Sequence, residues 1–267
     1  MNTLIKRNIL SGGQATLEPP DLGYSLSFNK VLSQYGRMGL ADPAIGGDHV
    51  LTDEPFYISF WWKLAAPASN TFFSWINPSF GSTDNYIASF VHGTYGYMRF
   101  KLSDAGTFGA GGITVLTSTS NVCDNDWHQI TIVNERDTLS SQAYLYVDDV
   151  EEATASSVND GTFEQSGTAV HWDFGLRNIS SPVYYDGQID QLIVGCGSGY
   201  AISASLVHTL WNNGETLSSL PPTIPYPQIY MKFNEGTGSL AANHGSLGSN
   251  GNMTLYNSPT WEHGAST

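Results

Sequence analysis

The chain of 267 residues carries a formal net charge of −14 at pH 7, and only 13% of its residues are charged. Its length suffices for one large all-β domain or two small ones, and a composition with 28 glycines favours a turn-rich β-sandwich over a helical bundle. The negative charge disfavours nucleic acid and anionic membranes as partners. No apolar run reaches the roughly 18 residues of a membrane span, and residues 1–10 lack the apolar core of a secretory signal.

Residues 1–23 show little periodicity and are interrupted by Gly12-Gly13 and Pro19-Pro20, so we expect an arm that docks on another surface. Beyond it, alternating apolar and polar residues predict strands. The clearest is 53–64, in which alternate residues from Phe56 to Trp62 face inward and those from Tyr57 to Lys63 face outward. Further strands are expected at 24–29, 71–76, 86–91, 95–102, 113–116, 170–176 and 187–195.

The most regular pattern lies between residues 124 and 154. Two alternating runs, Trp127–Val133 and Tyr144–Val147, are half-buried strands by their period of two. Asp148-Asp149 follows the second run, and aspartate tolerates the left-handed conformation that a tight turn requires. We therefore predict a hairpin with a return strand after residue 149. A single helix is predicted at 203–214, with Ser203 as its N-cap and Gly214 at its end.

These segments and their order resemble the laminin-G-like branch of the concanavalin A-like jelly rolls. The resemblance rests on Trp127-His128, on the strand that ends Tyr146-Val147-Asp148, on GQIDQLIVG at 187–195, and on the helix that follows. It implies an all-β jelly-roll sandwich of two antiparallel sheets with one short helix. With its proline-linked tail, the chain resembles the laminin-G-like domains of tailed-phage structural proteins.

The resemblance also suggests a domain organisation. Residues 24–216 form the laminin-G-like jelly roll, and 217–227 read as a proline-rich extended linker. Residues 228–267 resemble the segment that opens such a domain elsewhere, with YMKFNEGTG near its start and SPTW near its end. Since two isolated strands are unstable alone, we expect this tail to complete the same sandwich, and contact with a neighbouring chain is the alternative.

An enzymatic role is not expected. Glucanases with this fold use E-[IL]-D-x-x-E, and a retaining mechanism needs two carboxylates about 5 Å apart. The matching strand has Gln188 at the place of the nucleophile and Ile193 at the place of the acid, which leaves Asp190 alone. We therefore expect Asp190 to order a turn or the neighbouring backbone.

No cofactor is expected either. Many relatives bind a structural calcium through a D-S-S-G-N-G loop, and calcium prefers six to eight oxygens with carboxylates among them. The matching stretch, 243–252, lacks the leading aspartate, so a Gly-Asn turn loop is favoured over calcium. His128 is expected to be a packed strand residue. Cys123 and Cys196 are too few for a disulfide framework, and reduced thiols are favoured over one bridge.

Glycan binding is the remaining chemistry. Lectins of this fold stack sugar rings on exposed aromatic side chains and fix hydroxyls with polar groups. The Tyr184-Tyr185 pair is the best candidate, because one of two consecutive strand residues must face outward. The candidate glycan-binding residues in turn-rich segments are Asp84, Asn85, Tyr95, Tyr97, Trp172, Tyr184, Tyr185 and Asp186.

The sequence leads to two hypotheses on function. The first is a non-enzymatic virion structural protein, such as a phage capsid-decoration, fibre or spike subunit at the virion surface. Its partners would be other virion proteins, copies of itself as a trimer, and host glycans. The alternative is a carbohydrate-binding module or lectin that acts outside a virion. Neither hypothesis involves nucleic acid or a membrane.

Overall fold

The computed structural model describes most of the β-rich part of the chain. The described residues are 24–39, 55–64, 70–76, 86–92, 96–103, 113–135, 142–156, 171–177, 182–214 and 216–263. The predicted arm at 1–23 lies outside them. No helix in this described part has the length and apolarity needed to cross a bilayer.

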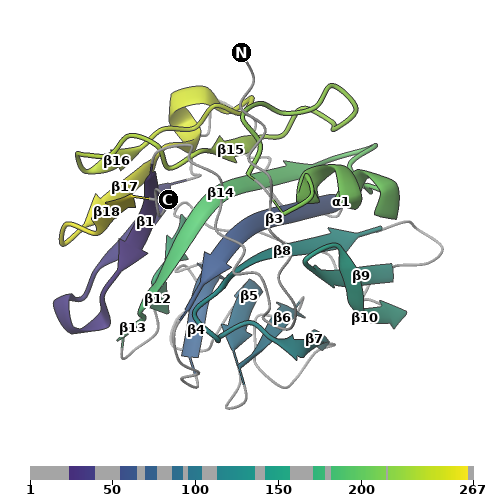
Figure 1. The fold of residues 1–267 in the computed structure, drawn as a ribbon, viewed down its shortest axis with the longest axis horizontal. Coiled ribbons are helices and arrows are strands. Elements are labelled where there is room, and N and C mark those ends of the chain that lie inside the picture. The colour runs from purple at the N-terminus through teal and green to yellow at the C-terminus, as the bar shows by residue number, and fades with distance from the viewer. Residues whose placement is uncertain are drawn as a thin grey trace, which may run out of the picture.

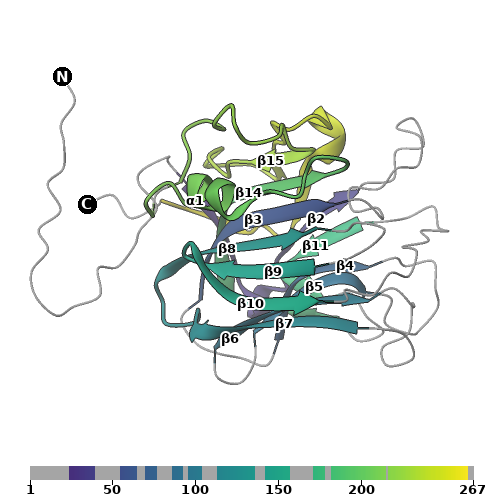
Figure 2. The ribbon, with the colours of Figure 1, turned by 90° about the vertical axis from the view of Figure 1, so that its right-hand side faces the viewer.

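Two eight-stranded antiparallel sheets pack face to face (Figures 1 and 2). The first sheet has the order β10-β9-β8-β3-β14-β1-β18, and β15 also pairs with β14. Its strands are β1 (Tyr24–Phe28), β3 (Phe56–Lys63), β8 (Trp127–Asn134), β9 (Gln142–Val147), β10 (Val150–Ser156), β14 (Gly187–Cys196), β15 (Ile229–Met231) and β18 (Thr260–His263).

The second sheet has the order β16-β17-β2-β11-β4-β5-β6-β7. Its strands are β2 (Tyr35–Gly39), β4 (Asn70–Ile76), β5 (Tyr86–His92), β6 (Tyr97–Ser103), β7 (Ile113–Asn121), β11 (His171–Phe174), β16 (Leu240–Ala241) and β17 (Met253–Tyr256). A separate ribbon joins β12 (Leu176–Arg177) and β13 (Val183–Tyr184). The two-sheet all-β fold with one short helix is as predicted.

The predicted hairpin is confirmed. Strands β9 and β10 are joined through the Val147–Val150 pair, with only Asp148 and Asp149 between them. Both aspartates have positive φ angles, 51° and 70°, as a two-residue turn of type I′ requires. The primed turn matches the right-handed twist of the strands, and so it fixes the register of this edge of the first sheet.

The main core lies between the two sheets, and β3 contributes to it as predicted. Phe56, Ile58, Phe60 and Trp62 are all at most 1% exposed and belong to this core. The outward face of β3 is buried as well, because a second apolar cluster covers it. Helix α1 (Ala204–Trp211) lies over this sheet (Figure 2), and Trp211 stacks on the buried Trp61 with ring centroids 5.3 Å apart.

The proline-rich segment 217–227 also belongs to this second cluster. Leu217 and Ile224 are buried in it together with Tyr57 and Tyr230. The Tyr57 hydroxyl donates a hydrogen bond to the Pro225 carbonyl at 3.1 Å. The segment therefore packs on the outer face of the first sheet instead of bridging two separate bodies.

The C-terminal strands join both sheets of the same chain. Strand β18 pairs with β1, β15 pairs with β14, and β17 pairs with β2. Strands β1 and β15 share one edge of β14, since β1 pairs with residues 187–189 and β15 with residues 192–194. Residues 229–263 thus close the first sheet and extend the second.

Candidate functional site

The predicted glycan-binding residues do not form one cluster. Asp84, Asn85 and Tyr95 lie outside the described residues. Tyr97 is half-buried at the start of β6. Two predictions need correction: Trp172 is fully buried and Tyr185 is only 2% exposed, so neither ring offers a surface for a sugar. Both side chains belong to the core between the sheets.

Tyr184 and Asp186 remain on the surface, beside two tyrosines that were not predicted from the sequence. Tyr184 lies 6.1 Å from Tyr35, measured between ring centroids. Tyr35 in turn stacks on Tyr256 at 4.6 Å, with only 3° between the ring planes. We call Tyr35, Tyr184 and Tyr256 the tyrosine platform.

Strand register explains why this platform faces solvent. In β2, Met38 is fully buried in the core, so alternation turns Tyr35 and Arg37 to the outer face of the second sheet. Tyr256 is the direct cross-strand partner of Tyr35 in β17 and is 39% exposed. The platform thus comes from strands far apart in the sequence.

A fixed guanidinium lies beside the platform. Arg37 donates two hydrogen bonds to the Asp173 carboxylate, from Nε at 2.6 Å and from Nη2 at 3.0 Å. Its Cζ lies 5.4 Å from the Tyr35 ring centroid. Burial alone lowers the pKa of Arg37, but the Asp173 carboxylate raises it above its usual value. The guanidinium therefore stays charged and is held at one orientation.

A second polar pair borders the platform. Asp186 accepts a hydrogen bond from the Lys30 backbone N–H and forms an ion pair with Lys30 Nζ, each at 2.9 Å. Lys30 opens the short 3-10 helix η1 (Lys30–Leu32), which Asn29 caps through its side chain. Val31 and Leu32 of this turn are 81% and 59% exposed.

The platform therefore combines the groups that a sugar needs. Partly exposed tyrosine rings stack on the apolar face of a pyranose, and their hydroxyls serve as donors and acceptors. The arginine and the Lys30–Asp186 pair offer charged donors and an acceptor nearby. The two carboxylates beside the rings are both paired, Asp173 with Arg37 and Asp186 with Lys30.

Asp190 has the backbone role that was expected of it. It lies at a β-bulge of β14 and accepts a hydrogen bond from the Gln191 N–H at 2.7 Å, while Gln191 has a φ of 44°. Asp190 is only 5% exposed, and this burial raises the pKa of its carboxyl well above the usual value. The neighbouring Gln191 carboxamide pairs with both backbone polar groups of Leu217 and so anchors the proline-rich segment.

The calcium-type loop at 243–252 does not fit a cation. Asn243 Oδ1 accepts from the N–H groups of Tyr230 and Gly245, at 2.7 and 2.9 Å. Its Nδ2 donates to the carbonyls of Gln228 and Gly248, both at 3.1 Å. Because the amide nitrogen points at the carbonyls, it occupies the place that a cation would need. No cluster of His, Cys, Asp or Glu suited to a metal occurs among the described residues.

His128 is packed in the strand, as expected, and also makes polar contacts. Its Nδ1 lies 2.7 Å from Asp148 Oδ2 and its Nε2 lies 3.0 Å from Asp124 Oδ1. Burial lowers the pKa of His128, but the two carboxylates outweigh it and raise the pKa to about 9. Cys123 and Cys196 are both buried and form no disulfide.

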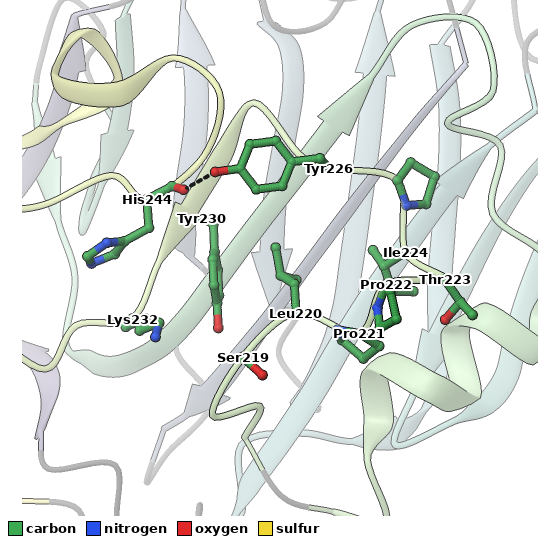
Figure 3. A pocket seen from close by; sticks show the side chains of 11 residues that line it. Ser219, Leu220, Pro221, Pro222, Thr223, Ile224, Tyr226, Tyr230, Lys232 and His244 are labelled. Carbon is green, nitrogen blue, oxygen red and sulfur yellow. Dashed lines mark hydrogen bonds between the residues drawn. The ribbon is translucent and has the colours of Figure 1, made fainter.

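A cleft of about 600 Å³ lies on the outer side of the first sheet, beside the second apolar cluster (Figure 3). One wall is the proline-rich segment 219–226, and the other consists of Tyr230, Lys232 and His244. Tyr226 is 59% exposed, and its hydroxyl donates to the His244 carbonyl at 2.8 Å, which joins the two walls. Nothing in the sequence pattern indicated this cleft, because the segment read as a linker.

Comparisons with known proteins agree on the fold. A Bacteroides ovatus protein described as a candidate carbohydrate-binding protein superposes with a TM-score of 0.61 at 15% identity, over 93% of this chain and 62% of that one. The chain therefore spans about three fifths of that relative. A SAP-like heptameric pentraxin from Limulus polyphemus gives 0.50 at 13% identity, over 76% of this chain and 87% of that one.

These identities show a shared fold alone. A search of curated protein sequences found no match. The family model described as the concanavalin A-like lectin/glucanases superfamily, in its Laminin_G_3 branch, matches residues 42–194, which is more than half of the chain. The chain therefore belongs to the concanavalin A-like lectin/glucanase superfamily.

Proposed function

We propose that this chain is a non-enzymatic carbohydrate-binding protein and that a glycan docks on the tyrosine platform. The observation that carries the proposal is the group of three adjacent tyrosine rings, Tyr35 and Tyr256 on the outer face of the second sheet and Tyr184 on the β12–β13 ribbon, with Tyr256 39% exposed. Clustered aromatic rings at a surface are typical of sites where a ligand stacks on them. The carbohydrate-binding description of the B. ovatus neighbour supports the same class.

The absence of a catalytic role is part of the proposal. Asp190 is the acid on the strand where related glucanases hold their carboxylates, and it is 5% exposed and accepts a hydrogen bond from the Gln191 N–H. Two converging carboxylates are needed for glycoside hydrolysis. Because Asp190 is buried and orders the backbone at Gln191, it supports a binding protein over a hydrolase.

The test is a glycan array followed by one pair of variants. Tyr256→Ala removes the most exposed ring of the platform, and Tyr226→Ala removes an exposed tyrosine on the opposite side as a matched control. For a neutral glycan that the wild-type protein binds, we expect Tyr256→Ala to weaken binding at least about tenfold, because a stacked aromatic anchor carries a large share of such an interface. Tyr226→Ala should retain the affinity. Equal affinities of Tyr256→Ala and wild type would contradict the proposal.

The virion role stays a prediction with a test of its own. No comparison supports it, and the arm at 1–23 on which it depends lies outside the described residues. A virion subunit would assemble into a trimer or a larger body that dissociates when residues 1–23 are removed. Mass measurement of the purified protein with and without them decides this point, and a monomer in both cases would leave the carbohydrate-binding proposal alone.

A further inference from the structure

The cleft behind the proline-rich segment differs in charge from the rest of the molecule. The chain has 24 acidic and 10 basic residues, yet none of the residues that line the cleft is acidic. Lys232 supplies a cation, and within the part of the chain that the structure describes it forms no ion pair. A cavity with such a cation in a strongly acidic protein is suited to an anionic ligand.

Lys232 is held in place in the cleft. Its Nζ donates to the Ser218 carbonyl at 3.1 Å and lies 5.6 Å from the centroid of the Tyr230 ring. A backbone carbonyl and a ring face neutralise no charge, so the ammonium keeps donors for a ligand. Figure 3 shows Lys232, Tyr230 and His244 along one side of the cleft.

The other walls are suited to a sugar ring. Leu220 and the prolines supply apolar surface, and the Tyr226 ring, 59% exposed, also lines the cleft (Figure 3). Ser219 and Thr223 add hydroxyls that can donate or accept. The volume of about 600 Å³ lies within the range of small-molecule sites and exceeds the needs of one pyranose.

We propose that this cleft is a second ligand site, which binds a sugar that carries a carboxylate, with Lys232 on the carboxylate and Tyr226 against the ring. The site lies on the outer side of the first sheet, whereas the tyrosine platform lies on the outer face of the second. In naming a sugar, the inference rests on the proposed carbohydrate-binding function, but it assigns the two sites ligands of different charge.

The test compares two sugars that differ only at carbon 6. Methyl β-D-glucuronide and methyl β-D-glucoside are titrated at constant ionic strength into ¹⁵N-labelled protein, and the amide resonances of Tyr226, Tyr230, Lys232 and His244 are followed. The glucuronide is expected to shift these resonances, and the glucoside to bind at least about tenfold more weakly, because it lacks the charge-assisted contact. Equal binding of the two sugars, or shifts that avoid these residues, would overturn the proposal.

Two variants test whether Lys232 is the cation that binds the carboxylate of the sugar. Lys232→Gln is expected to weaken glucuronide binding at least about tenfold. Lys63→Gln is the matched control, since Lys63 also lies over an aromatic ring, 5.9 Å from the Trp127 centroid, on another part of the molecule. Equal losses in both variants would mean that only the overall charge matters, which contradicts the proposal.

Further variants keep the test independent of folding and of the proposed function. Tyr226→Ala alters a ring that is 59% exposed, so it should preserve the fold and still weaken glucuronide binding. Retained affinity in this variant counts against the cleft. Tyr256→Ala should lose neutral glycans but bind the glucuronide normally, so failure of the platform and failure of the cleft give different results.

Discussion

Protonated His128 is predicted to stabilise the fold, and the effect can be worked out from its surroundings. The imidazole is 12% exposed and lies between Asp148 and Asp124. Its pKa rises from 6.5 to about 9. At about 1.4 kcal/mol per pKa unit, this rise corresponds to about 3 kcal/mol of stability.

The sign follows from the raised pKa. The folded state binds the proton more tightly than the unfolded state, so the stabilisation is fully present below pH 6.5. It is lost as the pH rises from 6.5 through about 9. We therefore expect His128→Gln to lower the free energy of unfolding by about 3 kcal/mol at about pH 6, and by much less at about pH 10.

The assay is urea unfolding of the wild-type and variant proteins across this pH range. Taking the difference between the two proteins removes the titration of all other groups. His208→Gln is the control. His208 of helix α1 pairs with Asp149 of the same hairpin turn, but its side chain is 64% exposed, and exposed ion pairs contribute little to stability. The reasoning would be refuted if His128→Gln changed the free energy of unfolding by the same amount at both ends of the pH range.

Four further predictions concern the loop 243–252 and the buried carboxyl of strand β14. Asn243→Asp should lower the free energy of unfolding by about 3 kcal/mol, since it places a carboxylate against two carbonyl oxygens. Millimolar calcium should leave the wild-type melting temperature unchanged, and a calcium-dependent rise would show that the turn-loop interpretation is wrong. Gly245→Ala should destabilise by about 1–3 kcal/mol in urea unfolding, because its Cβ would lie 2.4 Å from the Gln228 carbonyl oxygen. Gly39→Ala, with open space at its Cβ, should be neutral by the same measurement. Asp190→Asn should raise the melting temperature at about pH 7 and lose this advantage toward about pH 4, because a raised pKa means that wild-type stability falls as the pH rises from there. A difference in melting temperature that does not change across this range would contradict the raised pKa of Asp190.

The strand pattern and the hairpin were predictable because their signals are local. The alternation in β3 assigns every second residue from Phe56 to Trp62 to the core, and the Asp148-Asp149 pair fixes the turn. The burial of the other face of β3 was not predictable, because alternation tells which residues share a face and not what covers that face. The cover comes from the helix and the proline-rich segment, both distant in the sequence.

The candidate site was predictable only in part. Tyr184 was identified because one of two consecutive tyrosines must face outward, and the structure leaves Tyr184 partly exposed while Tyr185 lies in the core. Tyr35 lies in β2, whose five residues include two glycines that weaken a strand pattern, and Tyr256 lies at the end of the four-residue strand β17. Their pairing is set by the sheet order, which the sequence does not state.

The most direct test of the carbohydrate-binding proposal is a backbone amide NMR titration with the neutral glycan that ranks highest on the array. We predict that the shifted resonances cluster at Tyr35, Tyr184 and Tyr256 and that the shifts disappear in Tyr256→Ala. Saturable shifts located elsewhere on the molecule, with the same affinity in Tyr256→Ala, would contradict the proposal.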